Sequence, residues 1–154
     1  MASNVHILIT ERGLNELKAE LSGLKNVKRL ALVERLSIAR TMGDLAENSD
    51  YISAKEELSF MDSRIDELEE LVKEAKVAVP TNNDKIDFGH TVTVKINSST
   101  AKFQIVGEPE ADPTKRKISH SSPLGLALMG KKVGDKVEVM APVGKILYTI
   151  ISIE

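Results

Sequence analysis

One run of apolar residues constrains this chain more than any other feature. Between residues 51 and 79, apolar side chains recur at alternating spacings of three and four, and mostly charged or polar residues fill the positions between them. The run consists of Tyr51, Ala54, Leu58, Met61, Ile65, Leu68, Val72, Ala75 and Val79. This period is typical of a helix that packs along one seam against another helix. We therefore expect a coiled-coil helix over residues 51–79.

A second helix is expected upstream of this seam. Apolar residues at the same spacing begin at Leu14, Leu17, Leu21 and Leu24, but Lys28 occupies the next position, so the period slips there while the helix continues. Thr10 is a suitable N-cap, and Gly43 is suited to end the helix in a left-handed conformation. The two helices, each about 30 residues or roughly 45 Å long, would form an antiparallel hairpin. Its tip would be residues 43–51, with a tight turn at Gly43 and Asp44.

The chain changes character at Pro80. All five prolines lie at or after this residue, and residues 80–90 are polar and rich in breakers, as in a linker. Residues 90–96, 102–107, 135–140 and 145–153 are apolar or alternating and predict short antiparallel strands. One short helix is expected, with Ser122 as N-cap, Pro123 at its first position and Gly130 as its end. The predicted fold is α+β in two domains, a coiled-coil domain at 1–79 and a small sheet domain at 91–154.

Composition excludes several classes of function. The chain has no cysteine, so disulfides, cysteine-ligated zinc and thiol catalysis are excluded. Aromatic residues make up 3% and the net charge is -2, which disfavours a free-standing nucleic-acid reader or a small-molecule enzyme. His6, His90 and His120 lack metal-ligand spacing and are expected at the surface. The N-terminus lacks a signal-peptide pattern, so a cytoplasmic protein is expected.

Two carboxylates at the expected tip allow two interpretations. Asp44 and Glu47 have the spacing of a capping box, in which Asp44 accepts a backbone N–H of the second helix and Glu47 reaches back. Alternatively, two exposed carboxylates at the end of a thin rod could contribute ligands to a Mg²⁺ ion. Because Mg²⁺ takes about six oxygen ligands, a partner would have to supply the others.

The tip sequence and the second domain together resemble a known family. IARTMGDLAENSDYISAKEEL resembles the tip of the Gre family of bacterial transcript cleavage factors, and VGEPEAD, ISHSSPLGLALMGKKVGDKVEV and APVGKILYTIISI are similar to its C-terminal domain. The resemblance implies a factor that binds RNA polymerase, with its coiled coil in the secondary channel and an FKBP-like domain on the channel rim. It would stimulate cleavage of backtracked RNA 3′ ends as an accessory factor rather than as a free-standing enzyme.

The resemblance also assigns roles to individual residues. Asp44 and Glu47 would hold a Mg²⁺ shared with the polymerase active site and orient the attacking water. Further roles fall on three groups: the tip residues Leu45, Asn48, Ser49 and Tyr51, the RNA-proximal cations Arg40 and Lys55, and the docking residues Ser122 and Pro123. Arg40 and Lys55 could equally be solvated helix surface, and Ser122 and Pro123 could serve only to cap a helix.

The chain departs from the family pattern at two positions. Arg29-Leu30 replaces the Arg-Pro of many relatives, which predicts a less kinked first helix. Asp50 stands where Glu is usual. The low net charge favours the GreA type over the more basic GreB type.

The sequence also allows three other functions. A Gre-like inhibitor would occupy the channel without supporting cleavage, but such relatives carry a more acidic tip. A prolyl isomerase would need an aromatic pocket, yet the only aromatic residues after Pro80 are Phe88, Phe103 and Tyr148. In a plain coiled-coil scaffold, Asp44 and Glu47 would only cap a helix. Because the hairpin can satisfy its own seam, a monomer is expected.

Overall fold

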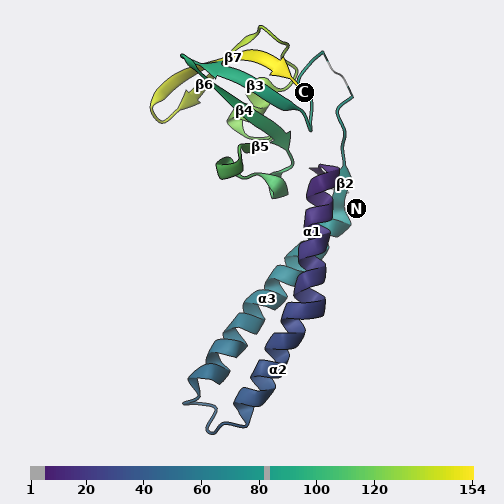
Figure 1. Ribbon diagram of the computed structural model, residues 1–154, viewed down its shortest axis with the longest axis vertical. Coiled ribbons are helices and arrows are strands. Elements are labelled where there is room, and N and C mark those ends of the chain that lie inside the picture. The colour runs from purple at the N-terminus through teal and green to yellow at the C-terminus, as the bar shows by residue number, and fades with distance from the viewer. Residues whose placement is uncertain (1–5, 82–83) are drawn as a thin grey trace, which may run out of the picture. The chain divides into compact units, whose positions relative to one another are not determined.

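The fold is α+β, as the sequence predicts, and it divides into two compact units. The computed structural model describes residues 6–81 and 84–154. One unit is Leu14–Glu74 and is helical; the other combines the residues up to Gly13 with Ala75–Glu154 and contains all the strands. Figure 1 shows the helices of the first unit and the strands of the second.

The hairpin consists of two helical arms. The first arm comprises α1 (Glu11–Gly23), a π-helical turn (Leu24–Lys28) and α2 (Arg29–Arg40), and the second is α3 (Ser49–Glu74). The predicted seam is confirmed along α3, where Ala54, Ile65 and Leu68 are buried. Leu32 and Leu36 of α2 pack against Ala54, with Tyr51, Leu58 and Met61 around them.

The π-helical turn coincides with the slip in the apolar period. From Leu24, a regular repeat would place the next seam residues at 28, 31, 35 and 38, but the buried residues of α2 are Leu32, Leu36 and Ala39. The seam therefore advances by one residue. A π turn accommodates one additional residue in a helix, so it keeps both parts of the first arm facing α3.

The second helix ends earlier than its apolar repeat. The expected helix to residue 79 is wrong, because α3 ends at Glu74 and Ala75–Val77 form strand β2. This strand pairs in parallel with β1 (Ile7–Ile9), in the register Ile7 with Ala75 and Ile9 with Val77. Ile9 is completely buried. Pairing with β1 thus competes successfully with continuation of the helix.

Five strands form the main sheet, in the order β5-β4-β3-β7-β6. Their bounds are β3 (Thr91–Ile96), β4 (Ser99–Val106), β5 (Lys117–Ser119), β6 (Lys136–Ala141) and β7 (Gly144–Ile153). The four predicted strands are confirmed and pair antiparallel. The short β5, which the sequence analysis did not predict, pairs in parallel with β4. Two 3-10 turns, Glu108–Glu110 and Pro113–Lys115, connect β4 to β5.

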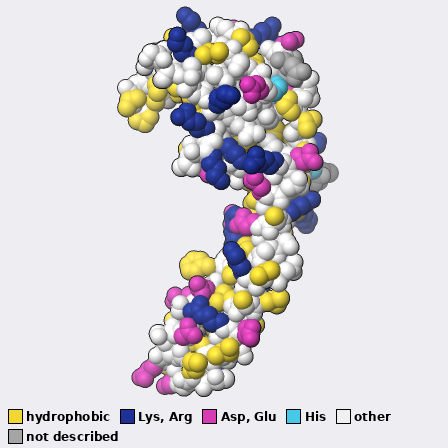
Figure 2. Space-filling view, viewed as in Figure 1, with side chains coloured by type: hydrophobic (Ala, Val, Ile, Leu, Met, Phe, Trp, Pro, Cys, Tyr) yellow, Lys and Arg dark blue, Asp and Glu magenta, His cyan; other side chains and the backbone are white. Residues whose placement is uncertain are grey.

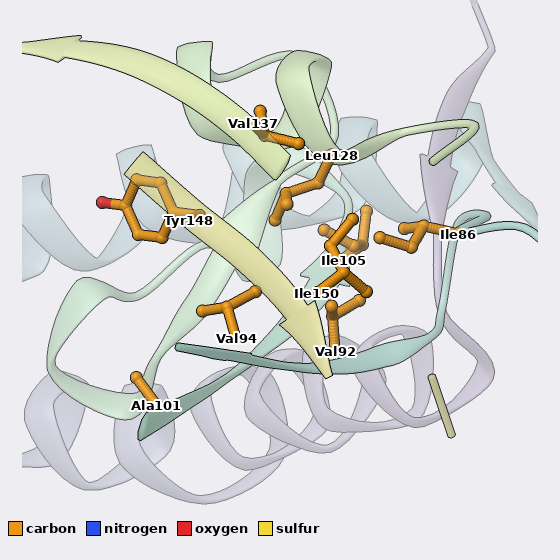
Figure 3. Close-up of a cluster of buried hydrophobic side chains, with 9 residues drawn as sticks. All are labelled: Ile86, Val92, Val94, Ala101, Ile105, Leu128, Val137, Tyr148 and Ile150. Atoms are coloured by element: carbon orange, nitrogen blue, oxygen red, sulfur yellow. The ribbon is translucent and has the colours of Figure 1, made fainter. Parts of the chain in front are cut away.

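The core of this unit lies on one face of the sheet. Figure 3 shows side chains from β3, β4 and β7 converging with Leu128 of α4 (Pro123–Leu128). The predicted helix cap is confirmed, since Ser122 Oγ accepts a hydrogen bond from the Gly125 N–H at 3.1 Å and Gly130 has a φ of 79°. The opposite face of the sheet carries the alternate residues of each strand.

The segment expected to be a linker contributes to this core. Residues 82 and 83 lie outside the described residues, but Ile86, Phe88 and His90 are all buried. The expectation of a surface histidine is therefore wrong for His90, whose Nδ1 accepts a hydrogen bond from the Asp87 N–H at 2.9 Å. Ile86 and Phe88 are core positions, but the sequence does not indicate this because most of the residues around them are polar.

Glu110 ties the start of α1 to the sheet-containing unit. Its carboxylate accepts hydrogen bonds from the N–H and hydroxyl of Thr10 and from the Gly107 N–H. Thr10 in turn caps α1 as predicted, because its Oγ1 accepts from the Gly13 N–H at 3.1 Å. The approach is close: a Cβ on Gly13 would lie 2.0 Å from Glu110 Oε1.

In the described part of the chain, no helix has the length and apolar character needed to cross a membrane.

Candidate functional site at the hairpin tip

The hairpin tip is a loop rather than a tight turn. Helix α2 ends at Arg40 and α3 begins at Ser49, so the predicted two-residue turn at Gly43 and Asp44 is wrong. Asn48 holds the loop at both sides: its Oδ1 accepts from the Tyr51 N–H at 3.0 Å, and its Nδ2 donates to the Ala39 carbonyl at 2.6 Å. One side chain thereby caps α3 and satisfies a terminal carbonyl of α2.

Asp44 does not cap α3, and the capping-box interpretation is wrong. Its Oδ1 accepts from the Ala46 N–H at 3.1 Å, and its carbonyl accepts from the Glu47 N–H at 3.3 Å. These bonds form a local turn over residues 44–47, before the N-cap residue Asn48. Because Asn48 occupies the N-cap position, the helix start leaves Asp44 and Glu47 without a capping role.

Both tip carboxylates face solvent. Residues 41–47 are all exposed, and Gly43 adopts a φ of 126°, which a glycine tolerates without strain. Within the described residues, no hydrogen bond or ion pair holds the Glu47 carboxylate. Asp44, Glu47 and Asn48 line a shallow polar hollow together with Met42 and Ser49. On the face seen in Figure 2, acidic side chains mark the hairpin end.

The tip alone offers few metal ligands. Across residues 6–81 and 84–154, no group of three or more His, Cys, Asp or Glu side chains could hold a metal ion. Asp44 and Glu47 provide carboxylate oxygens, the ligand type that Mg²⁺ prefers, but fewer than an octahedral ion requires. This donor set fits a shared ion and does not fit an ion bound by this chain alone.

The other predicted tip residues differ in their surroundings. Tyr51 is half-buried against the Leu32, Leu36 and Ala54 cluster, and the Arg40 guanidinium lies 5.9 Å from its ring centre. A cation at this distance is attracted by the aromatic ring. Leu45, Ser49 and Lys55 are exposed. The cation next to the Tyr51 ring is that of Arg40 and not that of Lys55.

Arg35 is a tip-proximal residue that the sequence analysis missed. It donates to Asp50 Oδ1 at 2.8 Å and to Glu57 Oε2 at 2.6 Å, so it joins α2 to the first turns of α3. The hydrogen bond with Asp50 is the main reason why the pKa of Arg35 is raised. No pattern in the sequence marks such a pair, because the contact arises only after the hairpin has folded.

Ser122 and Pro123 lie at the start of α4 in the sheet unit. Ser122 Oγ donates to the Ser119 carbonyl at 2.7 Å while it accepts from the Gly125 N–H. Pro123, at the first position of the helix, is exposed. The structural role of Ser122 as a cap is thus confirmed, and Pro123 remains accessible to a partner.

The three aromatic residues after Pro80 serve the core of the sheet unit. Phe88 is buried and meets the His120 ring edge-on at 5.3 Å, and Tyr148 is buried in the sheet core. Phe103 packs at the edge of this core, with the Arg116 guanidinium 5.9 Å from its ring centre. These rings are already in contact with other side chains, which disfavours the aromatic pocket of a prolyl isomerase.

Comparison with known proteins identifies the family. Residues 7–77 match the family "Transcription elongation factor, N-terminal", and residues 81–154 match "Transcription elongation factor, GreA/GreB, C-term". The chain is 43% identical to transcription elongation factor GreA of Bacillus licheniformis, over 99% of both chains. It is 41% identical to GreA of Lactococcus lactis subsp. cremoris, over 95% of this chain and 96% of that one.

A solved structure is also similar to this chain. GreA factor homolog 1 of Thermus thermophilus is 26% identical, covers 97% of this chain with 99% of its own, and gives a TM-score of 0.46. The family assignment rests on the sequence matches, which extend over both units. This chain belongs to the GreA/GreB family of transcription elongation factors.

Proposed function

We propose that this chain binds bacterial RNA polymerase and stimulates cleavage of backtracked RNA through Asp44 and Glu47. The observation that carries this proposal is the state of the tip carboxylates. They are exposed at the end of a hairpin and have no role in capping α3, because Asn48 performs that role. The GreA relatives, which share about 40% of its residues, are named as transcription elongation factors.

The tip would act by adding metal ligands to the active site of the polymerase. Asp44 and Glu47 would hold a Mg²⁺ shared with the polymerase, and such an ion supplies charge stabilisation for an in-line displacement at phosphorus. The Glu47 carboxylate is also free to accept a hydrogen bond from water. The partial donor set supports an accessory role rather than a free-standing enzyme.

The remaining tip residues would shape and support this contact. Asn48 fixes the loop between the arms, and Leu45 and Ser49 are exposed beside the acids. Lys55 and Arg40 would hold phosphates of the RNA 3′ end, with Arg40 already oriented by Tyr51. In the sheet unit, the exposed Pro123 beside Ser122 would dock on the polymerase rim. We expect a cytoplasmic factor that acts as a monomer, because the hairpin satisfies its own seam.

The proposal is tested with polymerase stalled in a backtracked complex that carries 3′-labelled RNA. The native chain should accelerate release of short 3′ fragments in Mg²⁺, and Asp44→Asn with Glu47→Gln should abolish this while still competing for polymerase. A matched control, Asp66→Asn with Glu70→Gln, removes two exposed carboxylates farther along α3 and should retain full activity.

Two results would overturn the proposal. If the native chain binds polymerase without accelerating cleavage, it is a channel-binding inhibitor. If the tip variant accelerates cleavage as well as the control does, the carboxylates at the tip have no part in it.

A further inference from the structure

Strand β6 lies at one edge of the main sheet, and β7 is its neighbour among the described strands. The phase of this pairing shows which backbone groups of β6 are used. The Ile150 N–H donates to the Asp135 carbonyl at 2.9 Å, and directly bonded pairs recur at every second residue of an antiparallel ladder. Val137 and Val139 therefore bond to β7. The side chain of Val137 is buried on the core face, close to α4 (Figure 3).

The alternate residues of β6 form an unpaired edge. The N–H and C=O groups of Lys136, Glu138 and Met140 point away from β7, and in the described part of the chain no backbone group outside the sheet bonds to them. Such an edge is a template for pairing with a further strand. Proline or a bulge commonly protects an edge strand, and β6 contains neither.

The charges on this edge restrict the strands that can pair with it. Lys136 and Glu138 are exposed on the outer face of the sheet, and within the described residues neither side chain has a hydrogen bond or an ion pair. Like charges directly opposite each other destabilise a strand pair, so charged residues discourage most partners. A matching strand must therefore present an acid opposite Lys136 and a base opposite Glu138.

A second copy of β6 meets this requirement. When two copies pair antiparallel about a two-fold axis at Val137, Lys136 of each copy lies opposite Glu138 of the other. Both residues have outward backbone groups, so each of these pairs shares two backbone hydrogen bonds, with Cα atoms about 5.5 Å apart. Opposite charges at this spacing stabilise a strand pair. One register thus provides both backbone bonds and two ion pairs.

Other two-fold registers match less well. An axis at Glu138 places this residue opposite its own copy, which sets two carboxylates against each other. An axis at Val139 places Lys136 opposite Pro142, which has no N–H to donate. The charge pattern therefore selects the axis at Val137.

Apolar side chains beside the edge support the same register. Leu147 is 52% exposed and lies opposite Glu138 on β7, so the ion pairs form next to it. Met140 is 69% exposed, and the register brings it opposite Gly134 of the second copy. The neighbour of this glycine, Val133, is 58% exposed. Pairing thus covers apolar surface that a single chain leaves in contact with water.

We propose that β6 is a self-association site, at which two copies of this chain pair antiparallel through Lys136 and Glu138. A contact between two short edge strands is smaller than the interface of a stable dimer. The association is therefore weak and reversible, which is compatible with a factor that acts on polymerase as a monomer. This inference goes beyond the proposed function and does not depend on it.

The test is sedimentation equilibrium of the full chain. Because a small interface gives weak association, the protein concentration should extend from about 10 µM to about 1 mM. The native chain should show a reversible equilibrium between monomer and dimer. Lys136→Glu and Glu138→Lys each set like charges against each other in both pairs, so each should raise the dissociation constant of the dimer about tenfold or more.

The decisive sample is an equimolar mixture of these two single variants. One variant has two acids in β6 and the other has two bases, so a mixed dimer regains both ion pairs and should form at least as readily as the native dimer. Lys95→Glu, at an exposed position of the central strand β3, is the matched control for the change in net charge and should associate like the native chain.

Three results would overturn the proposal. The native chain could remain monomeric over the whole concentration range, so that β6 does not pair with its own copy. The single variants could associate as well as the native chain, which would place the contact on another surface. Finally, a mixture that associates no better than the separate variants would exclude the pairing of Lys136 with Glu138.

Discussion

At the scale of single residues, Asn48 has the capping role that the sequence suggests for Asp44. Asp44→Ala removes only a turn contact, so the free energy of unfolding should change by a few tenths of a kcal/mol. Asn48→Ala removes the cap of α3 and leaves the Ala39 carbonyl without its partner, at a cost of about 1–2 kcal/mol. Urea denaturation of both variants measures the difference. Equal losses in the free energy of unfolding would indicate that Asp44 does cap α3.

Asp87 gives the sheet unit a specific sensitivity to acid. Its Oδ2 accepts from the N–H and hydroxyl of Thr81, and its Oδ1 accepts from the Phe88 N–H. These bonds, those of Thr81 first, lower the pKa of Asp87. Because the folded pKa lies below the unfolded one, the contribution to stability is present at neutral pH. It is lost as the pH falls below about 3.9, where an ordinary aspartate titrates.

The corresponding measurement is the Tm of the native chain and of Asp87→Asn between pH 7 and pH 3. The variant should melt lower at pH 7, and the gap should narrow at acid pH because protonated aspartate also loses the charge that these donors favour. Asp66→Asn, at an exposed site in α3, controls for the loss of a carboxylate. A gap that stays constant with pH would show that these bonds do not depend on the charge.

At the scale of elements, the π-helical turn can be treated as a one-residue insertion. Val27 lies in this turn and is 67% exposed, so deleting it should restore an α-helix and keep Leu24 and Leu32 on the same seam. We expect the deletion to raise the free energy of unfolding by about 1 kcal/mol, which corresponds to a Tm higher by about 4 °C. Deletion of Lys18 from α1 is the control, because it moves Leu14 and Leu17 off the seam and should lower the Tm. A lower Tm without Val27 would show that the π turn is itself stabilising.

Two glycines distinguish a tolerant element from a crowded one. Gly23 has helical φ and ψ of -63° and -41°, and a Cβ at this position would meet no other atom within 4 Å. Gly23→Ala should therefore raise the free energy of unfolding by about 0.5–1 kcal/mol. At Gly107 a Cβ would lie 1.9 Å from the Leu8 carbonyl oxygen, so Gly107→Ala should cost about 2 kcal/mol or more. Thermal denaturation of the two variants should give shifts of opposite sign, and shifts of the same sign would contradict the close approach of β1.

The sequence predicts the elements whose signals are periodic and local. The seam of α3, the four main strands and the Ser122 cap are confirmed because each depends on a repeat or on neighbouring residues. The predictions fail where a distant partner decides the outcome. Ala75–Val77 continue the heptad, yet they pair with β1, which lies more than 60 residues earlier in the chain.

The candidate site shows the same division. The motif identifies the exposed acids Asp44 and Glu47, but it does not predict the loop that presents them. That loop depends on Asn48 reaching across to α2, and on Arg35 joining α2 to Asp50 and Glu57. Spacing along the chain contains no information about contacts between the two arms.

At the scale of the whole molecule, the hairpin is an insertion into the sheet-containing unit. The chain leaves that unit after Gly13 and returns at Ala75. Glu110 fixes the outgoing segment through Thr10, and the pairing of β1 with β2 joins the outgoing and returning segments. The sheet-containing unit therefore includes contributions from both sides of the hairpin, and residues 80–154 alone lack part of their own unit.

This division predicts how the chain behaves when the hairpin is removed. Replacing residues 14–74 by about eight Gly and Ser residues, which span roughly 16 Å, should leave a unit that unfolds cooperatively. A fragment of residues 80–154 should melt at a lower temperature, because it lacks β1, β2 and the donors that Thr10 gives to Glu110. Circular dichroism of the two chains provides the comparison. Equal melting temperatures would mean that β1 and β2 only connect the hairpin and add nothing to the stability of the sheet.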